Sequence, residues 1–91
     1  MIKIISSGKR KEAVARAVIK GGSGKVTINK KPYETLNFFD KLKIEEPLRI
    51  SKNVLEGLNF DVAITVRGGG EKSQIEASRL ALARAIVNFA K

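Results

Sequence analysis

The residues with the clearest chemical potential in this sequence are cations, and they gather near its N-terminus. The 91 residues include 18 Lys or Arg and 9 Asp or Glu, a formal net charge of +9. Residues 1–31 hold nine of these cations and a single acid, Glu12. A strongly basic segment on an otherwise balanced chain predicts a polyanionic partner such as nucleic acid. The alternative is a solvated basic surface that serves solubility alone.

Three of the cations, Lys9, Arg10 and Lys11, follow Gly8 directly, and the residues after them alternate in polarity. We therefore expect a flexible basic turn at residues 8–11 that leads into a strand at residues 13–20. With a period of two, one face of that strand carries Val14, Arg16, Val18 and Lys20, and the other carries Ala13, Ala15, Ala17 and Ile19. The small apolar face suits a closely packed helix, and the charged face continues the basic turn as a surface for phosphates.

The sequence contains few residues that could serve as catalytic groups. The chain has no Cys and no His, which excludes thiolate and imidazole metal sites and both Ser-His and Cys-His catalysis. Lys9 and Lys25 each follow a glycine, but the earlier glycine and the later Ser or Thr of a phosphate-binding loop are missing around both. Glu45 and Glu46 would diverge by about 100° on a helix, so they do not converge on one substrate atom. We expect no catalytic residue, no metal and no cofactor.

The remaining pattern predicts one domain, residues 1–91, that contains both strands and helices. Strands are expected at residues 2–6, 13–20, 25–29 and 60–67, and the glycine loop at 21–24 should join the second and third strands as a hairpin, so that the first third forms a meander. Helices are expected at residues 35–51 and 71–91, with a polar connection over 51–59. Pro47 should kink the first helix or start a new first turn, and Ser73 with Glu76 fits a capping box at the start of the second.

No apolar run reaches the length of a membrane span, and Met1-Ile2-Lys3 does not open a signal peptide. The expectation is a soluble cytoplasmic protein.

Gly68, Gly69 and Gly70 lie between the last expected strand and the last expected helix. Free backbone N–H groups at such a junction can bind an anion, and Arg67 lies beside them, so phosphate contact is expected here. The alternative is a sharp turn without a ligand. The last helix also carries a stripe of small residues, Ala77, Ser78, Ala81 and Ala85. For this stripe we favour close packing against the neighbouring helix over direct contact with nucleic acid.

Several groups of residues together have the spacing of one known protein family. The C-terminal group is Gly68-Gly69-Gly70, two free positions, Ser73 and Gln74, and then Ala77, Ala81, Ala83, Arg84, Ala85 and Ile86. The N-terminal groups are the runs from Gly8 to Ala17 and from Gly24 to Asn29, and Glu46-Pro47-Leu48 lies between the two ends. With these motifs the chain resembles the small-subunit ribosomal protein nine family over nearly its whole length, and residues 42–48 are closer to archaeal than to bacterial members.

That resemblance implies a two-layer α+β sandwich of the α/β class, in the order β-β-β-α-β-α with a left-handed crossover, similar to the second domain of ribosomal protein S5. It also implies a cytoplasmic ribosomal protein that binds ribosomal RNA in the head of the small subunit, beside other head proteins and away from membranes. Family members continue into a basic tail that approaches the P-site transfer RNA. Because the present sequence ends at Lys91, that contact is not carried over.

The RNA-binding residues that the resemblance implies are spread over the turn, the strands and the last helix. They are Lys9, Arg10, Lys11, Arg16, Lys25, Arg67, the amides of Gly68, Gly69 and Gly70, and Gln74, Arg79 and Arg84. For Arg79, which falls near the apolar stripe, the alternative role is a structural one at the edge of the core.

A second hypothesis remains beside the ribosomal one. The same fold class includes small-molecule kinases and the protein subunit of a transfer-RNA-processing ribonucleoprotein, so a catalytic fragment or an RNA-binding domain outside the ribosome is the alternative. The kinase version needs a phosphate loop and a convergent acid or base, and the sequence shows neither. The sequence therefore favours a non-enzymatic RNA-binding protein.

Overall fold

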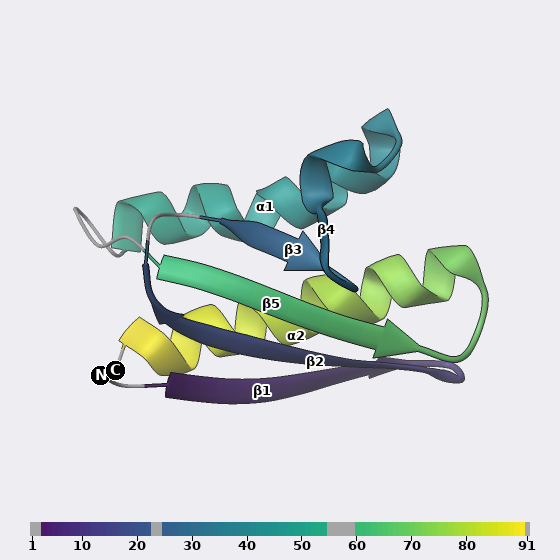
Figure 1. Cartoon of the computed structure of the whole chain (residues 1–91), viewed down its shortest axis with the longest axis horizontal. Coiled ribbons are helices and arrows are strands. Elements are labelled where there is room, and N and C mark those ends of the chain that lie inside the picture. The colour runs from purple at the N-terminus through teal and green to yellow at the C-terminus, as the bar shows by residue number, and fades with distance from the viewer. Residues whose placement is uncertain (1–2, 23–24, 55–59, 91) are drawn as a thin grey trace.

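The computed structural model describes residues 3–22, 25–54 and 60–90 (Figure 1). Its elements follow in the order β1 (Lys3–Arg10), β2 (Ala13–Gly21), β3 (Val26–Ile28), β4 (Lys31–Pro32), the 3-10 helix η1 (Tyr33–Thr35), α1 (Phe38–Val54), β5 (Phe60–Arg67) and α2 (Glu71–Ala90). The five strands form one sheet in the order β1-β2-β5-β3-β4. Both helices cover one face of this sheet, and the other face is open (Figure 1). The fold is the predicted two-layer α+β sandwich.

Alternation along the two inner strands divides the sheet into a core face and an open face. On β2 the predicted inward residues Ala13, Ala15, Ala17 and Ile19 are fully buried, and on β5 the buried residues are Phe60, Val62, Ile64 and Val66. Leu82 of α2 and Ile44 of α1 complete the same core and are also fully buried. The open face therefore consists of the intervening residues, which no helix covers.

Helix α2 lies very close to the β1 end of the sheet because both surfaces are made of small residues. A Cβ atom on Gly8 would lie 2.6 Å from the carbonyl oxygen of Ala77 and 2.6 Å from the amide nitrogen of Ala81. The predicted small stripe of this helix is buried here. At Ala77 and Ala81 the expected packing against the neighbouring helix is wrong. Glycine and alanine on the sheet have no bulky side chain, so the backbone of α2 lies directly against β1 here.

The predicted hairpin between the second and third strands is wrong. Strand β5 lies between β2 and β3, antiparallel to β2 and parallel to β3. Its core face carries four large apolar residues, whereas β3 offers only Val26 and Ile28. With β5 between β2 and β3, the most apolar surface is buried. This burial outweighs the tendency of a short glycine loop to join consecutive strands as a hairpin. The connection from β3 through α1 to β5 joins parallel neighbours, and its left-handed crossover stays a prediction.

The basic turn is shorter than expected. Strand β1 continues to Arg10, which is opposite Ala13 on β2, so that only Lys11 and Glu12 connect the two strands. Lys11 has a φ of 55°. Two-residue hairpin loops need positive φ values to match the twist of their strands. Lys9 and Arg10 are therefore strand residues with fixed directions, not members of a flexible turn.

The helix boundaries also differ from the sequence pattern. Pro47 lies inside α1 and is buried, so the expected new first turn there is wrong. Proline removes one intrahelical hydrogen bond and its ring crowds the preceding turn, and burial of the ring opposes this cost. Helix α1 continues to Val54, three residues beyond the predicted end, and the rest of the predicted connection, 55–59, lies outside the described residues.

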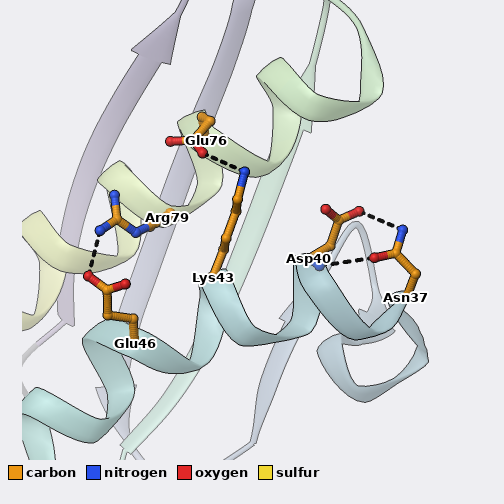
Figure 2. Close-up of polar contacts among 6 residues, drawn as sticks. All are labelled: Asn37, Asp40, Lys43, Glu46, Glu76 and Arg79. Atoms are coloured by element: carbon orange, nitrogen blue, oxygen red, sulfur yellow. Dashed lines mark hydrogen bonds and ion pairs between the residues drawn. The ribbon is translucent and has the colours of Figure 1, made fainter.

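The predicted capping box on the last helix is wrong because that helix starts at Glu71, which places Ser73 within its first turn. A cap of this kind occurs on α1 instead. The side-chain oxygen of Asn37 accepts a hydrogen bond of 3.0 Å from the amide of Asp40, and the Asn37 amide group donates one of 3.0 Å to the Asp40 carboxylate (Figure 2).

Candidate nucleic-acid interface

Six residues of the open face form two rows that run across β1, β2 and β5. Because directly opposed residues of an antiparallel pair point to the same face, the strand register gives each row. The first row, Ser7–Arg16–Thr65, and the second row, Lys9–Val14–Arg67, are next to each other near the β1–β2 hairpin. All six residues are exposed. We call these six residues the basic rows.

Among the described residues, no ion pair joins a cation of the basic rows to a carboxylate. The ion pairs found within the described residues all belong to the helical layer: Lys43–Glu76 at 2.9 Å, Arg49–Glu45 at 3.5 Å and Arg79–Glu46 at 2.6 Å. Figure 2 shows that the first and third of these join α1 to α2. Positive charge is therefore offset on the helical side of the molecule and left available on the open face.

The carboxylate of Glu76, on α2, lies close to several cations of the helical layer. It accepts a hydrogen bond from Lys43, which is the largest cause of a lowered pKa, and the charges of Arg79 and Arg10 act in the same direction. Arg10 is opposite the buried Ala13 in the register, whereas Lys9 is opposite the exposed Val14. The structure therefore separates Arg10 from Lys9 and places it on the side of the helices.

The glycine run connects β5 to α2 beside the hairpin. Gly68 and Gly69 have φ values of 82° and 63°, in the left-handed region. A Cβ atom on Gly68 would collide with the carbonyl oxygen of Glu12, and one on Gly69 would lie 2.9 Å from the amide nitrogen of Ala13. The turn thus needs glycine for both its conformation and its contact with the hairpin. Gln74 supports it by donating a hydrogen bond of 3.1 Å to the carbonyl oxygen of Gly68.

This turn fixes the position of Arg67 beside the hairpin, and RNA contact by the amides of Gly68, Gly69 and Gly70 and by Gln74 stays a prediction. Lys11 is exposed at the tip of the same hairpin, next to Glu12. Arg84 lies at the outer edge of the sheet and donates a hydrogen bond of 3.0 Å to the carbonyl oxygen of Ser7. The glycine run and Lys11 thus lie at the hairpin end of the basic rows, and Arg84 contacts the edge strand β1.

Two other predicted residues lie apart from the basic rows. Lys25 precedes β3, and its amide donates a hydrogen bond of 3.0 Å to the Asp61 carboxylate, at the opposite end of β5 from Arg67. Asp61 and Arg67 are six positions apart along this strand, about 20 Å. Arg79 is held by Glu46 at 2.6 Å, which supports the structural alternative for this arginine. RNA contact by either residue stays a prediction.

The sequence prediction missed several residues that the open face brings to the same surface. Ser7 and Thr65 are neutral, so a search for charge passes over them, and only the register shows that they flank Arg16. Lys20 shares the predicted face of Arg16, and alternation could have added it to the site. In the structure it is opposite Asp61, at the other end of β5 from Arg67, so it lies apart from the basic rows.

Other kinds of site find no support among the described residues. Within residues 3–22, 25–54 and 60–90, no group of three or more Asp, Glu, His or Cys side chains could hold a metal ion. None of the helices in this part of the chain is long and apolar enough to cross a membrane.

Comparison with known proteins shows which family the chain belongs to. A family model described as ribosomal protein S9/S16 matches residues 8–91. The chain is 47% identical over 87 residues to the small ribosomal subunit protein uS9 of Desulfurococcus amylolyticus, covering 94% of this chain and 61% of that protein. It is 49% identical over 83 residues to the protein of that name from Methanococcus maripaludis strain C7, covering 90% of this chain and 60% of that protein.

The corresponding protein of Thermoplasma acidophilum is 51% identical over 87 residues, with 94% of this chain and 66% of that protein covered. The chain thus spans about three fifths of the length of the curated relatives it matches. All three relatives are archaeal, as the sequence resemblance indicated. The chain belongs to the ribosomal protein S9/S16 family.

Proposed function

We propose that this chain is a non-catalytic structural component of the small ribosomal subunit and that the basic rows bind the backbone of ribosomal RNA. Its relatives are small-subunit ribosomal proteins by name, which supports the ribosomal role. The observation that carries the binding surface is the separation of charge between the two layers. The cations Lys9, Arg16 and Arg67 lie together on the open face, whereas the ion-paired carboxylates belong to the helical layer.

The geometry suits a phosphate backbone. Lys9 and Arg67 are separated by two strand pairings, about 10 Å between their backbones. Arg16 lies in the adjacent row, on the strand between them. Guanidinium groups bind phosphate oxygens with two parallel hydrogen bonds, and lysine adds a mobile point charge. Because the three side chains start from paired strands of one sheet, the cost of arranging their backbones is already met by folding.

We further propose that the protein lies in the head of the small subunit, beside other head proteins, within cytoplasmic ribosomes. Membership of the family supports this setting. Lys11, Arg84 and the glycine amides extend the proposed contact around the basic rows, and Lys25 offers a separate contact beyond them.

The test is binding of the chain to fragments of small-subunit ribosomal RNA over a salt series. Neutralising the three phosphates of the basic rows releases their counterions and gives a slope of about −2 to −3 when the logarithm of affinity is plotted against the logarithm of salt. Phosphate contacts by Lys11, Arg84 or Lys25 would make this slope steeper. A flat salt response, or no binding at low salt by a chain that circular dichroism shows to be folded, contradicts the proposed function.

A further inference from the structure

The first of the basic rows places two hydroxyl side chains on either side of one arginine. Ser7, Arg16 and Thr65 are directly opposite one another across β1, β2 and β5, so that one guanidinium lies between two hydroxyl groups. Opposed residues of antiparallel strands have Cα atoms about 4.5 to 5.5 Å apart, so both hydroxyls lie within reach of whatever Arg16 binds. All three side chains are exposed. The row offers one strong anion donor and two groups that both donate and accept hydrogen bonds.

This combination matches the sugar–phosphate surface of RNA in particular. Phosphates suit the arginine, and the ribose 2′-hydroxyl, which donates and accepts, suits Ser and Thr. In an A-form helix the 2′-hydroxyls line a wide and shallow minor groove, whereas DNA lacks them. Val14 and Ala63, which lie on the same face in the two adjacent rows, are short. The long side chains of the neighbouring row, Lys9 and Arg67, are cations that themselves suit phosphates.

None of the five aromatic side chains lies on the open face of the sheet. Phe60 and Phe89 pack together with ring centroids 5.8 Å apart on the core side, and the Tyr33 hydroxyl donates a hydrogen bond to Glu45. Phe38 and Phe39 are exposed and contact each other at the start of α1, outside the sheet. Proteins that recognise unpaired bases stack them on aromatic rings. The described residues of the open face on β1, β2 and β5 are instead Ser, Thr, Val, Ala, Ile, Lys, Arg and Asp.

We infer that the open face binds double-helical RNA through its minor groove, with Arg16, Lys9 and Arg67 on phosphates and with Ser7 and Thr65 on 2′-hydroxyl groups. The inference rests on the proposed function and deepens it, because it specifies which form of RNA the surface recognises. Recognition is then by shape and sugar chemistry and depends little on base sequence.

The test compares three probes of one sequence at one salt concentration: an RNA duplex of about 16 base pairs, the matching DNA duplex and the single RNA strand. The RNA duplex should bind several-fold more tightly than either of the others. Thr65→Val keeps the shape and the strand preference of the side chain but removes its hydroxyl. This variant should lose about two- to tenfold of the preference for RNA duplex over DNA duplex. Ser73→Ala, which removes a hydroxyl from α2, is the matched control and should retain the preference.

The outcomes separate this inference from the proposed function. Equal affinity for the RNA and DNA duplexes, or an unchanged preference in Thr65→Val, overturns the role of the hydroxyl row. Tighter binding of the single strand overturns recognition of the double helix. In these cases salt-dependent RNA binding, and with it the proposed function, still stands. Failure of the folded chain to bind any of the three probes at low salt overturns both.

Discussion

Lys9 and Arg10 are consecutive in the chain but lie on opposite faces of the sheet. Lys9 is opposite Val14, which is 45% exposed, and Arg10 is opposite Ala13, which is fully buried. Arg10 lies close enough to the helical layer to lower the pKa of Glu76, together with Lys43 and Arg79. Three consecutive cations in the sequence are therefore not one patch in the structure.

Because the two residues lie on opposite faces, substitutions that remove their positive charges should have different effects on RNA binding. Lys9→Gln should weaken RNA binding about equally for different sequences and make the salt slope shallower by about one unit, as expected for the loss of one phosphate contact. Arg10→Gln removes the same charge from the adjacent residue and should change the slope much less. Fluorescence anisotropy with a labelled RNA gives both values, and equal effects of the two substitutions would rule out the assignment of faces.

Gly8 should be required for the close contact between the sheet and α2. In Gly8→Ala the new Cβ would lie 2.6 Å from backbone atoms of Ala77 and Ala81, so the helix must move away from the sheet. We expect a loss of about 1 to 3 kcal/mol in the free energy of unfolding, measured by urea denaturation. The control is Gly21→Ala, since a Cβ there meets nothing within 4 Å. Two variants of equal stability would show that the contact is not tight.

Gly69 should be required for the turn that positions Arg67. Its φ of 63° is unfavourable for a β-branched residue, so Gly69→Val should lose about 1 to 3 kcal/mol of stability. Gly70 has no positive φ, and a Cβ there meets nothing within 4 Å, which makes Gly70→Ala the control. Thermal unfolding followed by circular dichroism measures the difference. A Gly69→Val protein as stable as the wild type would contradict the steric argument.

The ion pair between Lys43 and Glu76 should make stability depend on pH in the acid range. Because the folded-state pKa of Glu76 is lowered from its ordinary value of 4.5, the pair stabilises the protein above that pH. The contribution is lost as the pH falls through the lowered pKa. Both side chains are partly exposed, so the effect should stay below about 1 kcal/mol.

The comparison for this prediction is wild type against Glu76→Gln by urea denaturation at several pH values. The stability difference should be present at neutral pH and shrink below pH 4.5 as the wild-type carboxylate is protonated. A difference that persists unchanged in acid would mean that packing of the side chain, not its charge, is responsible.

The periodicity of apolar residues predicted which face of each strand and helix is buried. The two faces of β2, the inward apolar row of β5 and the small buried stripe of α2 follow from periodicities of 2 and 3.6 residues, and burial confirms them. Such periodicity does not contain strand order. The insertion of β5 between β2 and β3 depends on which strand buries the most apolar surface, and that competition involves residues about forty positions apart.

The candidate site shows the same limit. Composition placed the cations near the N-terminus, and alternation placed Arg16 on an exposed face, where the structure has it. The separation of Lys9 from Arg10 depends on where the hairpin turns. The pairing of Arg79 with Glu46 depends on how two helices pack, and the flanking of Arg16 by Ser7 and Thr65 depends on the register of three strands. None of these has a signal within a short stretch of sequence.

The most direct test of the central claim compares Arg16→Gln with Arg49→Gln. The two substitutions remove the same charge, one from the basic rows on the open face and one from α1 on the helical layer, where Arg49 is an exposed partner of Glu45. The measurement is the salt dependence of affinity for a fragment of small-subunit ribosomal RNA. The open-face assignment predicts that Arg16→Gln makes the slope shallower by about one unit and that Arg49→Gln leaves it unchanged. Equal slopes for the two variants, or a larger change in Arg49→Gln, would contradict RNA binding through the open face.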